Sequence, residues 1–288
     1  MNRTLIEWVK NPDGSQGYTW NPITGCLNHD NGLCKGGGFP CYAYKLAHGR
    51  LKQRYLANNN IAMKPLGLEG ALGYRYDQAD FKDPFYPRFW EERMACQFSY
   101  SGKAQGIFVC DMSDLFGIGV PDNWTWQVLQ LIKAYPQHRF YLLTKQPQNL
   151  IKFSPFPDNC WVGVTATSRE MLDTAIAHLI AIEAKVKYIS FEPLLDWRNF
   201  FFAGRFEQAL KTASITWLII GAQTKPYKPP EIEWVREIVE AADKAGIKVF
   251  LKDNLYLLLH SEPNFARDKL RVGTSGKLRQ EMPSIPSE

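Results

Sequence analysis

Residues 160–191 read CWVGVTATSREMLDTAIAHLIAIEAKVKYISF, and in this segment two largely apolar runs flank one helical pattern. The runs at 160–164 and 187–191 do not alternate with polar residues, which is typical of strands buried on both faces. Between them, Thr167 and Glu170 have capping-box spacing and precede apolar residues at helical intervals. The segment therefore predicts a strand–helix–strand unit with parallel strands.

The same pattern extends on both sides of this segment. Apolar runs occupy residues 107–110, 140–143, 160–164, 187–191, 217–220 and 249–251. Further helices are predicted at 122–134 and after Pro229-Pro230, with Gly246 as a C-terminal stop. With an N-terminal strand near 18–24, the pattern predicts an α/β fold with a closed or partial (β/α) barrel. A doubly wound open sheet is the alternative that periodicity leaves open.

Two segments depart from this pattern. Residues 51–105 hold many aromatic and charged side chains without a clear strand, and we interpret them as an insertion after the first βα unit, helical in part. Residues 261–288 are polar, and we expect a tail that lies on the surface or is partly disordered. The predicted organisation is one barrel domain over 1–260, which includes the insertion, followed by this tail.

The composition is that of a globular protein, with 45% hydrophobic and 22% charged residues. Neither a secretory signal in residues 1–14 nor a run long enough to span a bilayer is apparent, so we expect a cytoplasmic protein without a membrane partner. Six cysteines in a reducing compartment indicate metal or redox chemistry rather than disulfides. The net charge of +5 permits a nucleic-acid partner without requiring one.

Polar residues follow each of the six apolar runs. They are Asp111, Ser113, Asp114, Thr144, Lys145, Thr165, Thr167, Glu192, Gln223, Lys225, Lys252 and Asp253. Active sites of (β/α) barrels are built at the carboxyl ends of the strands. We therefore expect these side chains to share one site.

Three cysteines lie close together near the N-terminus. Cys26, Cys34 and Cys41 have the spacing C-x7-C-x6-C, and Gly32 and residues 36–38 supply glycines between them. A flexible, glycine-rich loop allows several thiolates to converge on one metal centre.

Three interpretations of these cysteines stay open at this point. Three thiolates on a four-iron cluster leave one iron free for a small-molecule ligand. The same cysteines with His29 suit a closed zinc site. The third interpretation is three unrelated thiols. The remaining cysteines differ, because Cys96 is isolated and Cys110 and Cys160 lie in apolar strands as small hydrophobic residues.

Eight segments in order carry a resemblance to a known family. They are TWNPITGC at 19–26, CYAYKLA at 41–47, IFVCDMSDLFG at 107–117, FYLLTKQP at 140–147, WVGVTAT at 161–167, ISFEPLL at 189–195, WLIIGAQT at 217–224 and LRQEMP at 278–283. The chain resembles the phage Gp37/Gp68 family, also called DUF5131 or the three-Cys-motif family, which is similar to radical SAM enzymes. Two features depart from relatives, namely the six residues KGGGFP between Cys34 and Cys41 and Gln223 in place of a glutamate.

The resemblance implies a (β/α) barrel with a [4Fe–4S] cluster on Cys26, Cys34 and Cys41. S-adenosylmethionine would bind the free iron and yield a 5′-deoxyadenosyl radical that abstracts hydrogen from a substrate. The implied substrate is unidentified, and a nucleic acid or nucleotide, a small molecule and a partner protein are alternatives. The resemblance also implies an electron donor and a methyltransferase-like partner protein.

The resemblance assigns cofactor contacts to the strand ends. Asp111, Ser113 and Asp114 are predicted to hold the amino group of S-adenosylmethionine. Thr144 and Lys145 are predicted to bind its carboxylate or an anionic substrate. Thr165 and Glu192 are predicted to contact ribose and adenine, and Lys252 to contact the substrate.

A basic stretch follows the third cysteine. It holds Lys45, His48, Arg50, Lys52 and Arg54, and Tyr42, Tyr44 and Tyr55 lie in the same stretch, which suits phosphate contacts and base stacking. The alternative is the solvated face of a helix. A non-catalytic, zinc-stapled nucleic-acid-binding module is the competing function.

Overall fold

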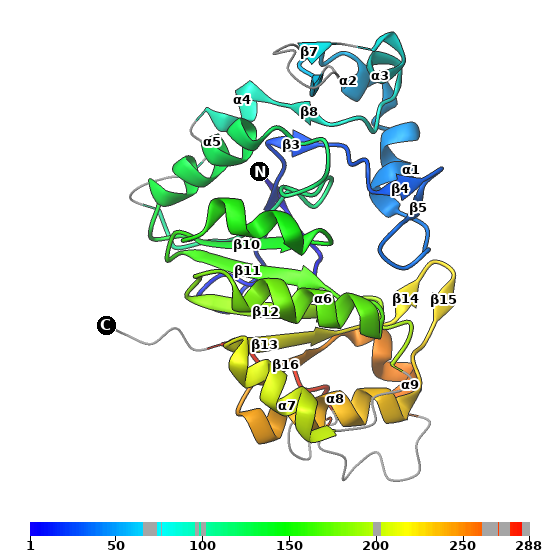
Figure 1. Cartoon of the computed structure of the whole chain (residues 1–288), viewed down its shortest axis with the longest axis vertical. Coiled ribbons are helices and arrows are strands. Elements are labelled where there is room, and N and C mark those ends of the chain that lie inside the picture. Colours follow the sequence, from blue (N-terminus) through cyan, green and yellow to red (C-terminus); the bar gives the residue numbers. More distant parts are fainter. Residues whose placement is uncertain are drawn as a thin grey trace. The chain divides into compact units, whose positions relative to one another are not determined.

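The computed structural model describes residues 1–65, 74–75, 77–95, 98, 102–197, 203–260, 270 and 277–283 (Figure 1). Within these residues the chain is a mixed α/β protein with mostly parallel strands, as the sequence predicts. It divides into two compact units. The first comprises residues 1–4, 9–149 and 157–159, and the second comprises 5–8, 150–156 and 160–288. None of the described helices is long and apolar enough to cross a membrane.

The main strands of the first unit have the order β1-β2-β9-β10. β1 (Asn2–Arg3) pairs antiparallel with β2 (Tyr18–Trp20). β2, β9 (Gly106–Val109) and β10 (Arg139–Thr144) are parallel, so their carboxyl ends lie at one edge. α5 (Asp122–Lys133) connects β9 to β10 and confirms the predicted helix.

Short pairs of strands and short helices complete the first unit. The pairs are β3 (Ile23–Thr24) with β8 (Arg88–Phe89), β4 (His29–Asp30) with β5 (Leu33–Cys34), and β6 (Lys64–Pro65) with β7 (Tyr74–Arg75). The helices are α1 (Tyr42–His48), α2 (Lys52–Leu56), α3 (Gln78–Lys82) and α4 (Glu91–Met94). The expectation of no strand in residues 51–105 is therefore wrong, because β6, β7 and β8 lie there. β8 pairs with β3, so the inserted segment is joined to the chain just before Cys26.

The strands of the second unit are parallel and have the order β11-β12-β13-β16. They are β11 (Cys160–Thr165), β12 (Val186–Phe191), β13 (Ile215–Ile220) and β16 (Lys248–Leu251). The connecting helices are α6 (Arg169–Ile180), α7 (Ala203–Thr212) and α8 (Ile232–Ala245), which lie beside these strands (Figure 1). Every residue of β11 and β12 is buried, as the continuous apolar runs predict. Smaller elements are the helices η1 (Pro147–Phe153), η2 (Asp253–Leu255) and α9 (Tyr256–His260), and the hairpin of β14 (Gln223–Thr224) and β15 (Tyr227–Lys228).

Large aromatic side chains pack on one face of the strands of the second unit. Trp217 contacts the rings of Trp8, Trp161 and Tyr188 with centroid distances of 6.0, 5.6 and 5.5 Å. Gly163 leaves the room that this packing needs, because a Cβ there would lie 2.5 Å from Cε1 of the Tyr188 ring. The strand run WVGVT therefore needs glycine at its centre.

The helix ends of the second unit agree with the sequence in part. α8 ends at Gly246, whose φ of 73° is left-handed as predicted. The capping box at Thr167 is wrong by one residue, because Ser168 is the N-cap of α6 and its hydroxyl accepts from the N–H of Met171. Thr167 is buried, and its hydroxyl contacts the Met171 sulfur at 3.2 Å.

The described part of the C-terminal tail pairs with β16. The N–H of Leu251 donates to the carbonyl of Arg279 at 2.7 Å, and that of Glu281 donates to Val249 at 2.9 Å. Since β13 occupies the other edge of β16, both edges of this strand are paired. No barrel closure is present among the described residues. Most of the predicted tail at 261–288 lies outside them.

Candidate functional site

The three N-terminal cysteines of the first unit lie on a hairpin and its two flanks. Cys26 follows β3, Cys34 ends β5, and Cys41 is the N-cap residue of α1. The turn between β4 and β5 is Asn31-Gly32, with φ values of 46° and 85°. Positive φ at both positions is typical of a tight hairpin turn, and Asn-Gly is the preferred pair. A hairpin is therefore present where the sequence suggested a flexible loop.

The KGGGFP spacer between the second and third cysteines closes on itself. The N–H of Cys34 donates to the carbonyl of Phe39 at 2.9 Å, and the N–H of Gly38 donates back to Cys34 at 2.7 Å. The N–H of Cys41 donates to Gly32 at 2.8 Å, which joins α1 to the hairpin turn. The extra residues thus form a closed loop, and the long spacing does not separate Cys34 from Cys41.

Gly25 holds the first cysteine against the inserted segment. Its φ is 88°, and a Cβ there would lie 2.5 Å from the carbonyl oxygen of Phe85 and 2.6 Å from the carbonyl carbon of Tyr86. The next N–H, that of Cys26, donates to the same Phe85 oxygen at 2.9 Å. Only glycine permits this approach, which explains the GC pair of the TWNPITGC segment.

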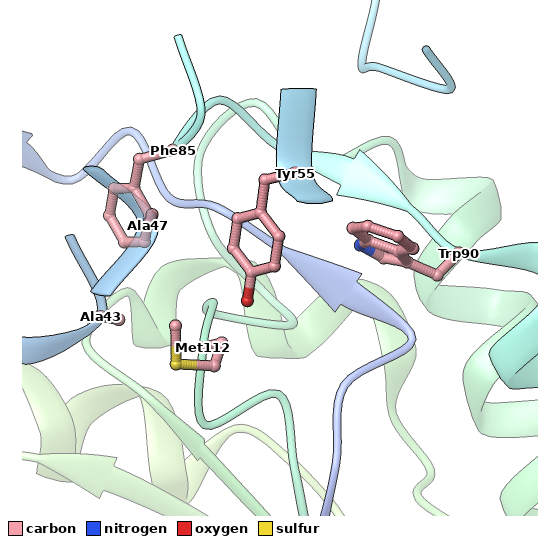
Figure 2. Packing of buried hydrophobic residues seen from close by; sticks show 6 residues of the cluster. All are labelled: Ala43, Ala47, Tyr55, Phe85, Trp90 and Met112. Atoms are coloured by element: carbon pink, nitrogen blue, oxygen red, sulfur yellow. The ribbon is translucent and has the colours of Figure 1, made fainter. Parts of the chain in front are cut away.

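A buried apolar cluster lies against two of the cysteines, and Figure 2 shows its six members. It comprises Ala43, Ala47, Tyr55, Phe85, Trp90 and Met112. Cys26 and Cys41 are partly buried and pack against it. The members come from α1, α2, the segments on both sides of β8 and the loop after β9, so distant parts of the chain form one apolar wall. Packing in this cluster accounts for the Met112 side chain.

Charges and N–H groups surround the thiols. The N–H of Asn28 points at the Cys26 sulfur at 3.3 Å, and the N–H of Gly36 bonds the Cys34 sulfur. Burial raises the pKa of the Cys26 thiol to about 12, and Asp114 adds to the rise, while Asn28 and Lys145 oppose it. Burial also raises the pKa of the Cys34 thiol, which Lys145 opposes. Both thiols therefore lie within the electrostatic reach of Lys145.

The residues after β9 lie against the first cysteine. The Ser113 hydroxyl donates to the carbonyl of Gly25 at 2.5 Å, and the N–H of Gly25 donates to Met112 at 3.0 Å. Asp111 accepts from the side chain of Asn21 at 2.6 Å, and burial raises its pKa. The structure therefore brings Cys26 together with the predicted strand-end residues. Asn21 is a contributor that the sequence did not single out.

Tyr42, next to the third cysteine, reaches the same strand end. Its hydroxyl donates to the carbonyl of Asp111, while 55% of the residue remains exposed. The ring therefore borders the site instead of being enclosed in the core.

Asp114 organises the end of β10. One carboxylate oxygen accepts from the Thr144 hydroxyl and the N–H of Lys145, both at 2.9 Å, and the other accepts from the N–H of Phe116 at 3.1 Å. The carboxylate is buried, and burial raises its pKa. Asp114 thus caps its own loop and fixes the start of the Lys145 segment.

Lys145 extends from this fixed backbone over the cysteine loop. Its ammonium nitrogen lies 5.9 Å from the centre of the Phe39 ring, within the KGGGFP spacer. The next residue, Gln146, was not predicted from the sequence. Its side-chain oxygen Oε1 accepts from the N–H of Ile118 at 3.0 Å, and its buried side-chain nitrogen Nε2 has no hydrogen-bond partner among the described residues. A buried donor without a partner adds to a site that can hold an acceptor.

The three cysteines and His29 do not form a site for a single metal ion in the described structure. No three His, Cys, Asp or Glu side chains in the described part of the chain could share one metal ion. His29, the fourth ligand of the zinc interpretation, accepts from the N–H of Gly32 at 3.4 Å and packs against the rings of Tyr44 and Phe85. In a cluster each cysteine binds a different iron, so the thiols need not converge on one point.

The other cysteines differ from these three. Cys160 and Cys110 are buried. Burial alone raises the pKa of the Cys160 thiol, and burial is the largest cause of the raised pKa of the Cys110 thiol. Cys160 begins β11, as expected of a small core residue. Cys110 was expected in a strand, but it follows β9 with a left-handed φ of 62°. Cys96 lies outside the described residues.

The predicted residues of the second unit form a separate polar group at its strand ends. Glu192 accepts from the Trp8 indole N–H at 3.1 Å and pairs with Lys252, whose ammonium also lies 3.9 Å from Glu7. Lys252 passes over Gly221, where a Cβ would lie 2.9 Å from its Cδ. Burial lowers the pKa of Lys252, but the carboxylates outweigh it and the net pKa is raised.

The remaining strand-end predictions have other surroundings. Thr165 is buried at the end of β11 and lies in register with Ser190. Gln223 begins β14 and donates to the carbonyl of Pro226 at 3.0 Å. Neither contacts the Glu192 and Lys252 pair through a described hydrogen bond.

Comparison with known proteins gives one match. A family model described as protein of unknown function (DUF5131) matches residues 3–269. No curated protein and no solved structure matches the chain.

Proposed function

The chain belongs to the DUF5131 family of proteins of unknown function, and from its cysteine site we propose that it is a radical SAM enzyme related to the phage Gp37/Gp68 proteins. Cys26, Cys34 and Cys41 would hold a [4Fe–4S] cluster. With S-adenosylmethionine bound, this cluster would supply a 5′-deoxyadenosyl radical for hydrogen abstraction from a substrate. The finer fold that we propose for the mostly parallel strands is a partial barrel of the radical SAM type.

One observation carries the proposal. Three thiols lie on one hairpin and its flanks. Two of them, those of Cys26 and Cys34, receive backbone N–H groups and lie within the electrostatic reach of Lys145. N–H donors to sulfur and an apolar wall are the features by which proteins stabilise and tune iron–sulfur clusters. Three cysteines also leave one iron open to a small molecule.

The strand-end residues take different roles in this proposal. Asp111 keeps acceptor capacity beside Asn21, so it would bind the ammonium of the cofactor. Lys145 would attract the carboxylate, and the amide of Gln146 offers a further donor. Asp114 and Thr144 would act by positioning Lys145, since their polar atoms already bond one another. Ser113 would hold Gly25, and through it Cys26.

The contacts of Thr165 and Glu192 with ribose and adenine, and of Lys252 with substrate, stay predictions from the family resemblance. Glu192 would have to exchange its bond with Trp8 or Lys252 to accept a ribose hydroxyl. An electron donor is required to reduce the cluster, and a methyltransferase-like partner protein stays a prediction.

Metal content tests the first part of the proposal. Protein reconstituted anaerobically should contain iron and acid-labile sulfide, and Cys26→Ser, Cys34→Ser and Cys41→Ser should each lose most of the iron. Cys160→Ala is the matched control, because this buried thiol lies in the second unit and should leave the iron in place. Stoichiometric zinc without iron in the parent protein would instead establish the zinc-stapled module.

Cofactor binding tests the second part. We expect S-adenosylmethionine to shift the electron paramagnetic resonance signal of the reduced cluster and to yield 5′-deoxyadenosine. Asp111→Asn and Lys145→Gln should keep the iron but weaken cofactor binding about ten- to a hundredfold, since each removes a charge-assisted bond of roughly 1.5–3 kcal/mol. Lys133→Gln, an exposed lysine at the end of α5, is the control. If Asp111→Asn and Lys145→Gln bind the cofactor as well as the parent and the Lys133→Gln control, the assignment of the cofactor to these strand ends is wrong.

A further inference from the structure

The positive charge of this chain is concentrated in one short segment. Residues 31–56 contain five Lys or Arg and no Asp or Glu. The whole chain has 34 Lys or Arg and 29 Asp or Glu, so the rest of it holds 29 of each and is neutral. The entire net charge of +5 therefore lies in the segment that carries Cys34, Cys41, α1 and α2.

All five cations of this segment are exposed. They are Lys35, Lys45, Arg50, Lys52 and Arg54. None of them forms an ion pair with a carboxylate among the described residues, whereas the neighbouring His48 lies 3.6 Å from Asp83. Exposed cations that no carboxylate neutralises produce a field that attracts polyanions.

The fold holds these cations in fixed positions. The N–H of Leu51 donates to Leu46 at 3.0 Å, and that of Lys52 donates to Gly49 at 3.1 Å, so a tight turn joins α1 and α2. The apolar face of the two helices is buried in the cluster of Figure 2 through Ala43, Ala47 and Tyr55. Their charged faces are therefore directed to solvent.

We propose that residues 31–56 form a surface that binds the phosphate backbone of a nucleic acid, and that this nucleic acid is the substrate of the cysteine site. The first half of this inference is independent of the proposed function, and the second half rests on it. Phosphodiesters match a row of exposed cations that has no acidic residue within it. The half-exposed ring of Tyr42, between Cys41 and Lys45, offers a surface on which a base can stack.

A lipid surface is the less suitable partner. A helix that binds in the membrane interface must insert its apolar face into the lipid. Here that face is already buried against Phe85 and Trp90, and Tyr42 is the one large apolar residue of α1 and α2 that is exposed in the described structure. Across residues 31–56 the exposed large apolar side chains are Tyr42 and, in the hairpin, Leu33, so the described surface offers charge with little apolar area for insertion.

Salt-dependent binding tests the surface. A fluorescein-labelled single strand of about 20 nucleotides, as RNA and as DNA, is titrated with the full-length protein and followed by fluorescence anisotropy. Five phosphate contacts predict a slope of about −3.5 in log affinity against log salt, or roughly a hundredfold loss between about 50 and 200 mM. The variant carries Lys45→Gln, Arg50→Gln, Lys52→Gln and Arg54→Gln. It should keep a slope of only about −0.7.

The control removes the same total charge elsewhere. It carries Lys103→Gln, Lys133→Gln, Lys185→Gln and Lys228→Gln, all at exposed lysines. This control should bind like the parent, and both variants should keep the parent's melting temperature. Equal weakening by the two variants, or equally strong binding of polyglutamate or of phosphatidylserine vesicles by the parent, overturns the inference.

Iron content and 5′-deoxyadenosine separate the two proposals. We expect the variant with the four substitutions at Lys45, Arg50, Lys52 and Arg54 to load iron like the parent. The oligonucleotide should accelerate 5′-deoxyadenosine formation in the parent and in the control, but not in this variant. Nucleic-acid binding by a protein that never takes up iron would uphold the surface and end the radical proposal. Iron loading without salt-dependent nucleic-acid binding would uphold the cluster and refute the nucleic-acid-binding surface.

Discussion

Replacing Gly25 by Ala tests whether the backbone contact with the inserted segment positions the first cysteine. The substitution has two costs. A residue with a Cβ at a φ of 88° is destabilised by about 1–2 kcal/mol. The new Cβ would also meet the Phe85 carbonyl oxygen at 2.5 Å, and overpacking of this kind costs about 1–3 kcal/mol. We expect a loss of about 2–5 kcal/mol in the free energy of unfolding, together with loss of iron because Cys26 must move.

Gly14→Ala is the matched control for this change. Its φ is 82°, nearly that of Gly25, but no atom lies within 4 Å of the added Cβ. It should therefore show only the conformational cost of about 1–2 kcal/mol and retain iron. Urea unfolding followed by tryptophan fluorescence gives both free energies, and iron analysis gives the second readout. If Gly25→Ala costs no more than Gly14→Ala and keeps its iron, the contact with Phe85 and Tyr86 does not position the cysteine.

Three further predictions concern the second unit. Gly163→Ala should lower the free energy of unfolding by about 1–3 kcal/mol, because the Tyr188 ring occupies the space of the new methyl; a stability equal to the parent's in urea would contradict this packing. Glu192→Ala should cost about 1–3 kcal/mol by removing the main partner of the largely buried Lys252, and Glu192→Gln, which still accepts from Trp8, should cost less. Equal losses in thermal melts would show that the Trp8 bond contributes nothing, and a Glu192→Ala variant as stable as the parent would show the same of the pair with Lys252. Burial raises the pKa of Glu7 in the folded protein above its value in the unfolded chain. The contribution of this group to the free energy of unfolding is therefore fully present below the unfolded-state pKa and is lost as pH rises through the folded-state pKa. The stability of Glu7→Gln relative to the parent should therefore rise from acidic to neutral pH, and a pH-independent difference would refute the shift.

The strands were predictable because their signal is local. Continuous apolar runs at β9 to β13 and at β16 reflect burial on both faces of each strand. Each run can therefore be recognised from its own residues, without knowledge of the strands beside it. The N-cap of α6 was misplaced because Thr167 and Ser168 are adjacent hydroxyl residues. Only the backbone decides which of the two side chains reaches the N–H of Met171.

The surroundings of the cysteines were less predictable. The spacing of Cys26, Cys34 and Cys41 predicted a group of thiols, but the Phe85 and Trp90 wall depends on pairing between β3 and β8, far apart in sequence. No local pattern records such pairing. The unpartnered amide of Gln146 was likewise invisible, because any glutamine in a loop is expected to be solvated.

The pairing of residues 279–281 with β16 has a consequence for the behaviour of the protein in concentrated solution. An uncovered strand edge presents free N–H and C=O groups to other chains and promotes edge-to-edge aggregation. The tail occupies these groups through the bonds of Leu251 and Glu281, and the charged side chains of Arg279 and Glu281 lie along it. Residues 279–281 therefore cover a strand edge that could otherwise pair with another copy of the protein. We expect a protein shortened before residue 279 to expose this edge of β16 and to aggregate more readily, although all strands of the sheet are retained.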